Sequence, residues 1–258
     1  MEGLRIKPYV RRLELDRERV PDFSDYPFCI PAVRHLHALP LHEKVTFFIG
    51  DNGMGKSTLM EALAIACGCC PEGGGRNFRL STRDTHSQLY RYLRLEKGPL
   101  PPRDNYFLRA ESFYNVATYI QELDEFPSDA PLLGDNYGGP LHEQSHGESF
   151  FALLNERLGR DGLYLFDEPE AALSPMRQMA MLTAMQRLVR WGSQLIIATH
   201  SPILMAYPDS VIYQLDGDGI RRVKYEETDH FRVTRDFLNR YPALLRILLE
   251  ESENTDEG

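Results

Sequence analysis

Residues 45–58 read VTFFIGDNGMGKST, an apolar run followed by a glycine-rich loop. The run, Val45–Ile49, has the composition of a buried strand, and apolar residues recur after the loop at the spacing of a helix face. This predicts a strand, a loop and a helix, the start of a βαβ unit. Two further runs without polar alternation, Leu163–Phe166 and Leu195–Ala198, predict strands of a parallel sheet that helices cover on both faces, with a helix over about 175–191 between them.

The loop carries the complete pattern G-x-x-x-x-G-K-S and continues with a threonine. Its positions are Gly50, Asp51, Asn52, Gly53, Met54, Gly55, Lys56, Ser57 and Thr58. The glycines let successive backbone N–H groups converge on phosphate oxygens, and the following helix presents its positive N-terminal end. We expect the Lys56 ammonium to reach the β- and γ-phosphates and the Ser57 hydroxyl to ligate Mg²⁺. The loop therefore predicts a site for ATP and Mg²⁺.

Two carboxylates follow the apolar run that ends at Phe166. Asp167 and Glu168 are expected at the C-terminal edge of a buried strand, where open α/β sheets bind ligands. Asp167 can hold Mg²⁺ through water, and Glu168 can act as the general base that polarises the attacking water. Because adjacent side chains of a regular strand point to opposite sides, we expect the two carboxylates to take different roles.

A histidine follows the next run, in the sequence Thr199-His200-Ser201-Pro202. At a sheet edge beside a phosphate site, a neutral imidazole can sense the γ-phosphate and orient water. A lone histidine after a strand is more often structural, but this one follows the carboxylate strand by one helix. We therefore expect Lys56, Glu168 and His200 to be the catalytic residues.

The hexapeptide QSHGES, residues 144–149, lies between the glycine-rich loop and the carboxylate strand. The four motifs in this order closely resemble the ATP-binding-cassette (ABC) type of ATPase, in which a signature sequence begins a helix and caps the γ-phosphate of ATP on the opposite protomer. A serine hydroxyl, a glycine N–H and a helix N-terminus form an anion receptor. The resemblance implies that Ser145, Gly147 and Glu148 bind ATP in trans, although His146 replaces the usual glycine and Glu148 the common glutamine.

The details resemble one branch of that superfamily. Asn52, the sequence DEPEAALSP at 167–175 and THSP at 199–202 are similar to SMC, RecF and OLD-like heads, including small bacterial AAA-type ATPases, more than to transporter cassettes. The resemblance implies an α/β P-loop NTPase fold of ABC type: a mostly parallel sheet with flanking helices, an N-terminal antiparallel β edge and a small helical signature lobe. It also implies that residues 172–174 cross between two protomers.

Two features of the family have more than one candidate. The glutamine that normally senses Mg²⁺ corresponds either to Gln88 or to Glu111. The aromatic side chain that often stacks on adenine corresponds to Phe23, Tyr26 or Phe28, and each of these suits packing equally well.

The composition, with 258 residues, 42% hydrophobic and 26% charged, is typical of a globular protein. No apolar run approaches the roughly 20 residues of a membrane span, and the N-terminus lacks a signal-peptide core, so we expect a cytoplasmic protein. Because the cysteine spacing does not suit a closed zinc site, we interpret the cysteines as free thiols and the His-x-His pair as structural. These residues are Cys29, Cys67, Cys69, Cys70, His35 and His37.

The net charge of −9 argues against non-specific coating of nucleic acid, but the charge is uneven. Eight basic residues against three acidic ones lie between Arg76 and Arg109. That segment is a candidate surface for a polyanion, and an ordinary solvated surface is the alternative. Residues 250–258 are acidic and are expected to be a disordered tail.

Residues 1–258 are expected to form a single domain with an insertion and signature lobe over about 76–150. Val10–Leu15 and Phe28–Ile30 are expected as antiparallel strands. Gly98–Gly139 is expected as an irregular insertion that contains a strand-like stretch at 106–108. We expect a further strand at Val211–Leu215, closed by a turn at 216–219, and a last helix over about 232–250.

The 58 residues after His200 leave no room for a nuclease domain, and residues 56–145 leave none for coiled-coil arms, so we expect an ATPase head alone. The expected function is ATP hydrolysis by a head that forms a homodimer around two ATP molecules and acts on DNA or a partner effector in repair or phage defence. The alternatives are the nucleotide-binding subunit of a membrane ABC transporter and a module that binds ATP with little hydrolysis.

Overall fold

The computed structural model describes residues 8–75, 87–110 and 150–253, and its central element is a seven-stranded sheet of order β10-β9-β3-β8-β7-β6-β4. The strands β9, β3, β8, β7 and β6 are parallel, whereas β10 and β4 pair antiparallel at the two edges. This confirms the predicted mostly parallel α/β fold. The strands are β3 (Val45–Ile49), β4 (Gly74–Gly75), β6 (Asp104–Arg109), β7 (Gly162–Asp167), β8 (Gln194–Ala198), β9 (Ser210–Asp216) and β10 (Gly219–Val223).

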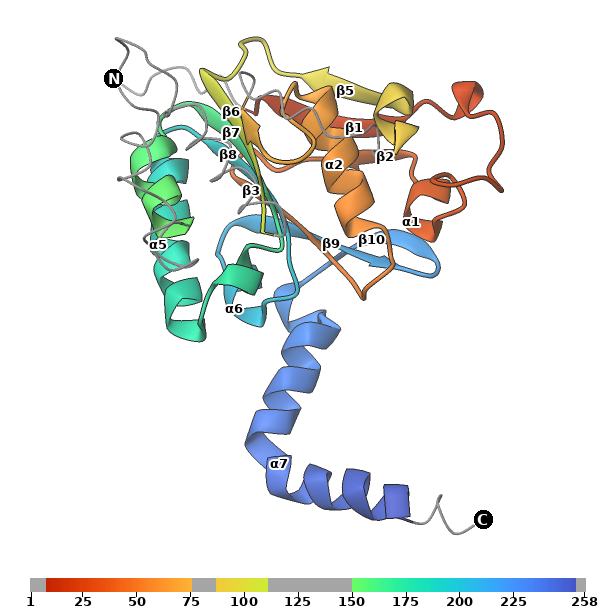
Figure 1. Cartoon of the computed structure of the whole chain (residues 1–258), viewed down its shortest axis with the longest axis vertical. Coiled ribbons are helices and arrows are strands. Elements are labelled where there is room, and N and C mark those ends of the chain that lie inside the picture. The colour runs from red at the N-terminus through yellow and green to blue at the C-terminus, as the bar shows by residue number, and fades with distance from the viewer. Residues whose placement is uncertain (1–7, 76–86, 111–149, 254–258) are drawn as a thin grey trace, which may run out of the picture.

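The central strands are buried on both faces, which explains their continuous apolar runs. Because successive side chains of a strand face opposite sides, Phe47 packs into a core beneath α5 (Pro175–Arg190), and Phe48 packs into a second core with α2 (Lys56–Ala66). Figure 1 shows these two helices on opposite faces of the sheet. The predicted helix between the carboxylate and histidine strands is therefore confirmed as α5.

The antiparallel part forms a separate three-stranded sheet of order β2-β1-β5, from β1 (Val10–Leu15), β2 (Ala38–Pro40) and β5 (Leu93–Lys97). The strand predicted at Phe28–Ile30 is wrong: these residues form turns that lead into α1 (Pro31–Arg34). Pro31 occupies the first position of that helix, where its missing N–H removes no intrahelical hydrogen bond and its fixed φ favours a helix.

Part of the expected irregular insertion is a strand of the main sheet. Asp104–Arg109 forms β6, which pairs in parallel with β7 and is buried from Asn105 to Leu108. The apolar residues of this stretch therefore outweigh the prolines just before it. Residues 111–139 of the expected insertion lie outside the described part of the chain.

Short elements join the strands and helices. They are the 3-10 turns η1 (Arg17–Arg19), η2 (Gln88–Tyr92), η6 (Pro169–Ala172) and η7 (Tyr225–Glu227), the π-helical turn η5 (Leu153–Arg157) and the helix α6 (Pro202–Met205).

The last helix, α7 (Asp229–Glu253), projects away from the body of the molecule (Figure 1). It continues past residue 250, so the expected disordered tail is helical as far as Glu253. A kink at Arg240, with φ −135° and ψ 23°, precedes Pro242 and bends the helix. Large apolar side chains such as Val233, Leu238 and Leu248 are exposed on it. No helix in the described ranges is both long and apolar enough to span a membrane.

Candidate nucleotide site

Three of the four predicted motifs meet at one edge of the sheet. The strands β3, β8, β7 and β6 are parallel neighbours, so their C-terminal ends lie side by side. The register sets Ala198 level with both Phe48 and Asp167, and Arg109 level with Asp167. The glycine-rich loop after β3, the carboxylates at the end of β7 and the histidine after β8 therefore surround one place.

The loop needs its glycines for steric reasons. Gly50 has φ +143°, and a Cβ atom there would lie 2.2 Å from the carbonyl oxygen of Leu215 in β9. Gly55 has φ +92°, and its Cβ would lie 2.6 Å from Cγ2 of Ile30. Both positions combine a backbone conformation that side chains disfavour with close packing, so the loop can take this shape only with glycine there.

Lys56 is buried at the start of α2, and its ammonium group lies inside the loop. Nζ donates to the backbone carbonyl oxygens of Gly50 at 2.8 Å and Asp51 at 3.1 Å. Burial lowers the Lys56 pKa, and the nearby carboxylates of Glu168 and Asp167 oppose that shift. A cation held at the centre of a loop of backbone groups fits the binding of a phosphate anion.

Ser57 and Asp167 bring together the two predicted metal ligands. The Ser57 hydroxyl donates to Oδ1 of Asp167 at 3.3 Å. This pair of neighbouring oxygen ligands fits Mg²⁺, which prefers oxygen donors. Arg109 ends β6 beside them, with Nε 3.6 Å from Oδ2 of Asp167 and its guanidinium 3.4 Å from Glu61. From its sequence Arg109 is only one member of a basic segment, although its place at the end of the apolar run Tyr106–Leu108 indicates a position at the sheet edge.

Glu168 is the residue immediately after β7, and it has the left-handed conformation φ 50°, ψ 50°. The backbone N–H of Glu168 donates to the carbonyl oxygen of Ala198 at 2.9 Å, and the Oε1 atom of Glu168 lies 3.5 Å from Nε2 of His200. The two carboxylates therefore diverge because the chain turns at Glu168, and the predicted reason, strand alternation, is wrong. A strained conformation of this kind is typical of functional sites.

The loop that carries His200 is fixed by Glu170, a residue that was not among the predicted site residues. The half-buried Glu170 carboxylate accepts hydrogen bonds from Thr199 Oγ1 at 2.7 Å and from the His200 backbone N–H at 2.5 Å. Burial raises the Glu170 pKa. Burial and the Lys56 ammonium both lower the His200 pKa, which favours the neutral imidazole that was expected. The signal for Glu170 was the third carboxylate of the sequence DEPE, residues 167–170.

Among the remaining candidates for the signature and the Mg²⁺-sensing residue, the structure describes Gln88 alone. Residues that lie outside the described ranges are Ser145, Gly147, Glu148 and Glu111. Gln88 is exposed in η2.

The three candidate adenine-stacking residues differ in exposure. Phe28 is buried with its ring centroid 4.9 Å from that of Tyr92, and Arg17 lies 4.4 Å from the centroid of Phe23. Tyr26 is 66% exposed and is therefore the most accessible of the three.

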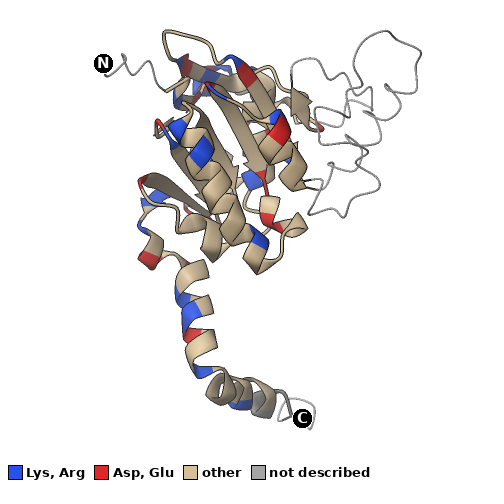
Figure 2. Ribbon diagram, turned by 90° about the vertical axis from the view of Figure 1, so that its left-hand side faces the viewer, with Lys and Arg blue, Asp and Glu red and all other residues tan. Residues whose placement is uncertain are grey.

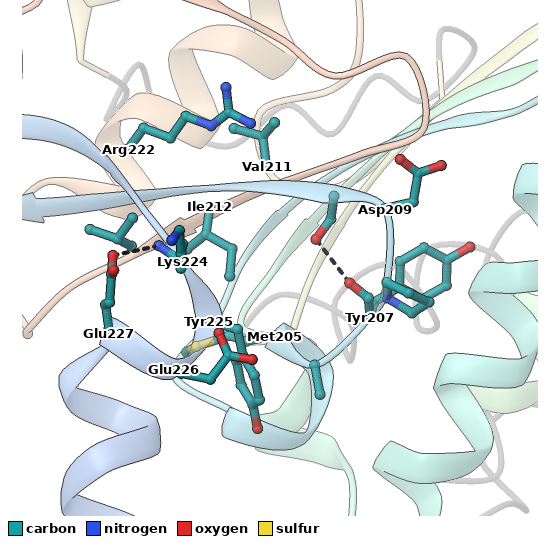
Figure 3. A pocket seen from close by; sticks show the side chains of 14 residues that line it. Met205, Tyr207, Asp209, Val211, Ile212, Arg222, Lys224, Tyr225, Glu226 and Glu227 are labelled. Carbon is teal, nitrogen blue, oxygen red and sulfur yellow. Dashed lines mark hydrogen bonds between the residues drawn. The ribbon is translucent and has the colours of Figure 1, made fainter.

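A hollow of about 600 Å³ lies between the end of α6, the strands β9 and β10, and η7 (Figure 3). Side chains of both charges line it together with apolar ones: Asp209, Glu226, Glu227, Arg222 and Lys224 beside Met205, Ile212 and Tyr225. None of the predicted site residues lines it, so the hollow is distinct from the edge where the motifs meet.

Residues 133–206 match the family described as "AAA domain, putative AbiEii toxin, Type IV TA system". This stretch includes QSHGES, both carboxylates and His200. The mostly parallel sheet with helices on both faces is an α/β fold. The chain is also 25% identical, over 197 residues, to the macrolide export ATP-binding/permease protein MacB of Neisseria meningitidis serogroup B. That alignment covers 66% of this chain and 28% of MacB, so the chain spans less than a third of that relative.

Two solved structures are similar at low identity. The SMC head domain from Thermotoga maritima is 14% identical with a TM-score of 0.45, covering 84% of this chain and 100% of the other. The cbiO1 protein from Clostridium perfringens, part of the ABC transporter complex cbiONQ, is 17% identical with a TM-score of 0.48, covering 94% of this chain and 99% of the other.

Proposed function

We propose that this chain is an ABC-type ATPase head that hydrolyses ATP in the presence of Mg²⁺ and closes with a second copy of itself around two ATP molecules. The observation that carries the proposal is the convergence, at one sheet edge, of the Lys56 loop, the Ser57–Asp167 pair and the Glu168–His200 pair. Together they supply a phosphate cradle, oxygen ligands for a cation and a carboxylate base beside a neutral imidazole.

Each residue has a role that follows from its surroundings. Lys56 binds the terminal phosphates, and Ser57 with Asp167 holds Mg²⁺, which neutralises phosphate charge when it is bound. Glu168 accepts the proton of the attacking water. His200 donates a hydrogen bond to the terminal phosphate or to that water.

The dimer part of the proposal rests on the signature sequence. In the ABC type of ATPase, residues equivalent to Ser145, Gly147 and Glu148 complete the site of the opposite protomer. Contacts to the γ-phosphate favour closure, and hydrolysis removes them, so the ATP cycle opens and closes the dimer.

We further propose that this cycle acts on a partner effector protein, with DNA as the alternative. The basic segment gives DNA limited support, because Arg94 lies 2.7 Å from Asp16 and Arg103 lies 3.6 Å from Asp161. Figure 2 shows basic positions spread over the body and α7. Binding to DNA that weakens steeply with added salt would favour the alternative.

The match to MacB supports a second candidate function, the nucleotide-binding subunit of a membrane transporter. Copurification with a membrane permease would favour this candidate. The Asp-Glu-Pro-Glu and Thr-His-Ser-Pro sequences favour the first proposal.

The proposal is tested by light scattering on the Glu168→Gln variant, which should bind ATP and not hydrolyse it. We expect its mass to double when Mg-ATP is added, and the added substitution Ser145→Arg to abolish the doubling. Wild-type protein should release phosphate from ATP, whereas Glu168→Gln should lose most of this turnover. A Glu168→Gln protein that binds ATP and stays monomeric would contradict the dimer part.

A further inference from the structure

His200 contacts a second histidine that lies thirty residues later in the chain. Its Nδ1 atom is 3.2 Å from Nε2 of His230, and the two ring centroids are 5.4 Å apart. On its other side, Nε2 of His200 lies 3.5 Å from Oε1 of Glu168. His230 is the second residue of α7, so a helix outside the four motifs reaches the centre of the candidate site.

The fold anchors both members of this pair. The backbone of His200 is held by Glu170, as described above. The first turn of α7 is capped by the buried Thr228, whose hydroxyl oxygen accepts a hydrogen bond from the N–H of Phe231 at 3.2 Å. Just before it, the Tyr225 hydroxyl donates to the carbonyl oxygen of Pro202, two residues after His200, at 2.8 Å. The contact between the two rings is therefore part of the packed structure.

The protonation of the two rings decides which histidine donates the hydrogen bond between them. Burial lowers the pKa of both histidines, so both rings are neutral near pH 7 and one must donate while the other accepts. A proton on Nδ1 of His200 would leave the lone pair of Nε2 facing the Glu168 carboxylate, acceptor against acceptor. A proton on Nε2 of His200 avoids that repulsion, and Nδ1 then accepts from Nε2–H of His230.

We propose that His230 is a positioning residue that fixes the tautomer of His200, with the proton on Nε2. This inference rests on the proposed function, because the role of His200 belongs to it. Among the described residues, the Nε2 atom of His200 is buried, and Oε1 of Glu168 faces it at 3.5 Å, longer than an ordinary hydrogen bond. An N–H held there by His230 is directed at the Glu168 side of the site, where the proposed terminal phosphate or attacking water would accept from it.

Three variants of His230 separate positioning from packing. The amide nitrogen of His230→Gln can donate to His200 as the imidazole does, His230→Leu can neither donate nor accept, and His230→Glu can only accept. His37→Leu, at an exposed position in the three-stranded-sheet region, is the matched control. Thermal unfolding followed by circular dichroism checks that every variant is folded.

The first measurement is the tautomer of His200, read from two-bond ¹H–¹⁵N spectra of protein labelled with ¹⁵N-histidine. The His200 signal is assigned by its loss in His200→Gln. We expect a proton on Nε2 in the wild type and in His230→Gln, a smaller excess of that tautomer in His230→Leu, where only Glu168 still favours it, and a proton on Nδ1 in His230→Glu. An unchanged His200 tautomer in both His230→Leu and His230→Glu would overturn the proposal.

The second measurement is ATP turnover. We expect His230→Leu and His230→Glu to lower kcat by about tenfold or more with KM for ATP within about twofold, and His230→Gln to restore most of kcat. A kcat that is the same in His230→Leu, His37→Leu and wild type would also overturn the proposal. If the wild type does not hydrolyse ATP, the proposed function fails, and the spectra still decide whether His230 sets the tautomer.

Discussion

At the scale of single residues, the site depends on backbone conformations that side chains rarely permit. We predict that Gly50→Ala destabilises the protein by more than about 3 kcal/mol, because strain at positive φ adds to a clash of the new Cβ atom with the carbonyl oxygen of Leu215, 2.2 Å away. Gly53→Ala is the matched comparison, since φ is +81° there and no atom lies within 4 Å of the added Cβ. We expect Gly53→Ala to lower the free energy of unfolding by only about 1–2 kcal/mol. Urea unfolding without nucleotide measures both, and equal losses would show that the packing against β9 is unimportant.

The histidine pair predicts how stability changes with pH. Burial is the main cause that lowers the pKa of His200 and of His230 below the ordinary value of 6.5. The unfolded chain therefore binds protons first, so this contribution is complete above pH 6.5 and is lost as the pH falls through the lowered values. Lys56 lowers the His200 pKa further, Glu168 and Asp51 oppose it, and Asp51 and Asp229 oppose the shift of His230.

The comparison of wild type with His230→Gln isolates this contribution. Glu170 has the opposite effect, because its raised pKa lets the folded state take up a proton on acidification, but it is the same in both proteins. We expect the free energy of unfolding, measured with urea, to fall from pH 7.5 to 5.5 by less in His230→Gln. Equal slopes would mean that the half-buried imidazoles do not govern stability in this pH range.

At the scale of elements, strands were predicted best where a local apolar pattern determines the structure. The runs at β3, β7 and β8 were placed to within one residue, because strands buried on both faces are continuously apolar. The strand β1 was also placed correctly, although it has exposed charged residues between its buried ones. The three-stranded sheet was placed less well, since β5 pairs with β1 from about eighty residues away and no local pattern shows that partnership. Residues 28–30 lie between Pro27 and Pro31 and form turns. The preference of proline for turns therefore outweighs the apolar character that predicted a strand there.

The helices α5 and α7 should respond differently to the same substitution. Leu188 in α5 is fully buried, whereas Leu248 in α7 is 59% exposed. Replacing leucine by alanine changes helix propensity little, so burial should decide the outcome. We expect Leu188→Ala to lower the free energy of unfolding by about 2–5 kcal/mol and Leu248→Ala to change it by less than about 0.5 kcal/mol. A large loss in Leu248→Ala would show that α7 is covered in solution.

At the scale of the whole molecule, the motif residues could be foreseen because each follows an apolar run, and parallel strands bring their C-terminal ends to one edge. Glu170, Arg109 and His230 were missed because their roles depend on tertiary contacts. His230 is the clearest case: it lies beyond the four motifs, and only the packing of η7 and the first turn of α7 against α6 brings it to His200. The residues proposed to do the chemistry are thus easier to predict than those proposed to orient them.

Nucleotide binding should stabilise the whole molecule by linkage. At an ATP concentration of about 100 Kd, the expected gain is about 2.7 kcal/mol, or roughly 5–10 °C in Tm for a chain of this size. Lys56→Met separates this gain from the stability of the nucleotide-free fold. A buried cation is costly to desolvate, and replacing it by an apolar side chain of similar size removes that cost together with its interactions. We therefore expect Lys56→Met to keep a Tm near the wild-type value without ATP and to lose most of the shift when Mg-ATP is added. Calorimetry with and without Mg-ATP measures both quantities, and a full shift in Lys56→Met would place the nucleotide elsewhere than in the glycine-rich loop.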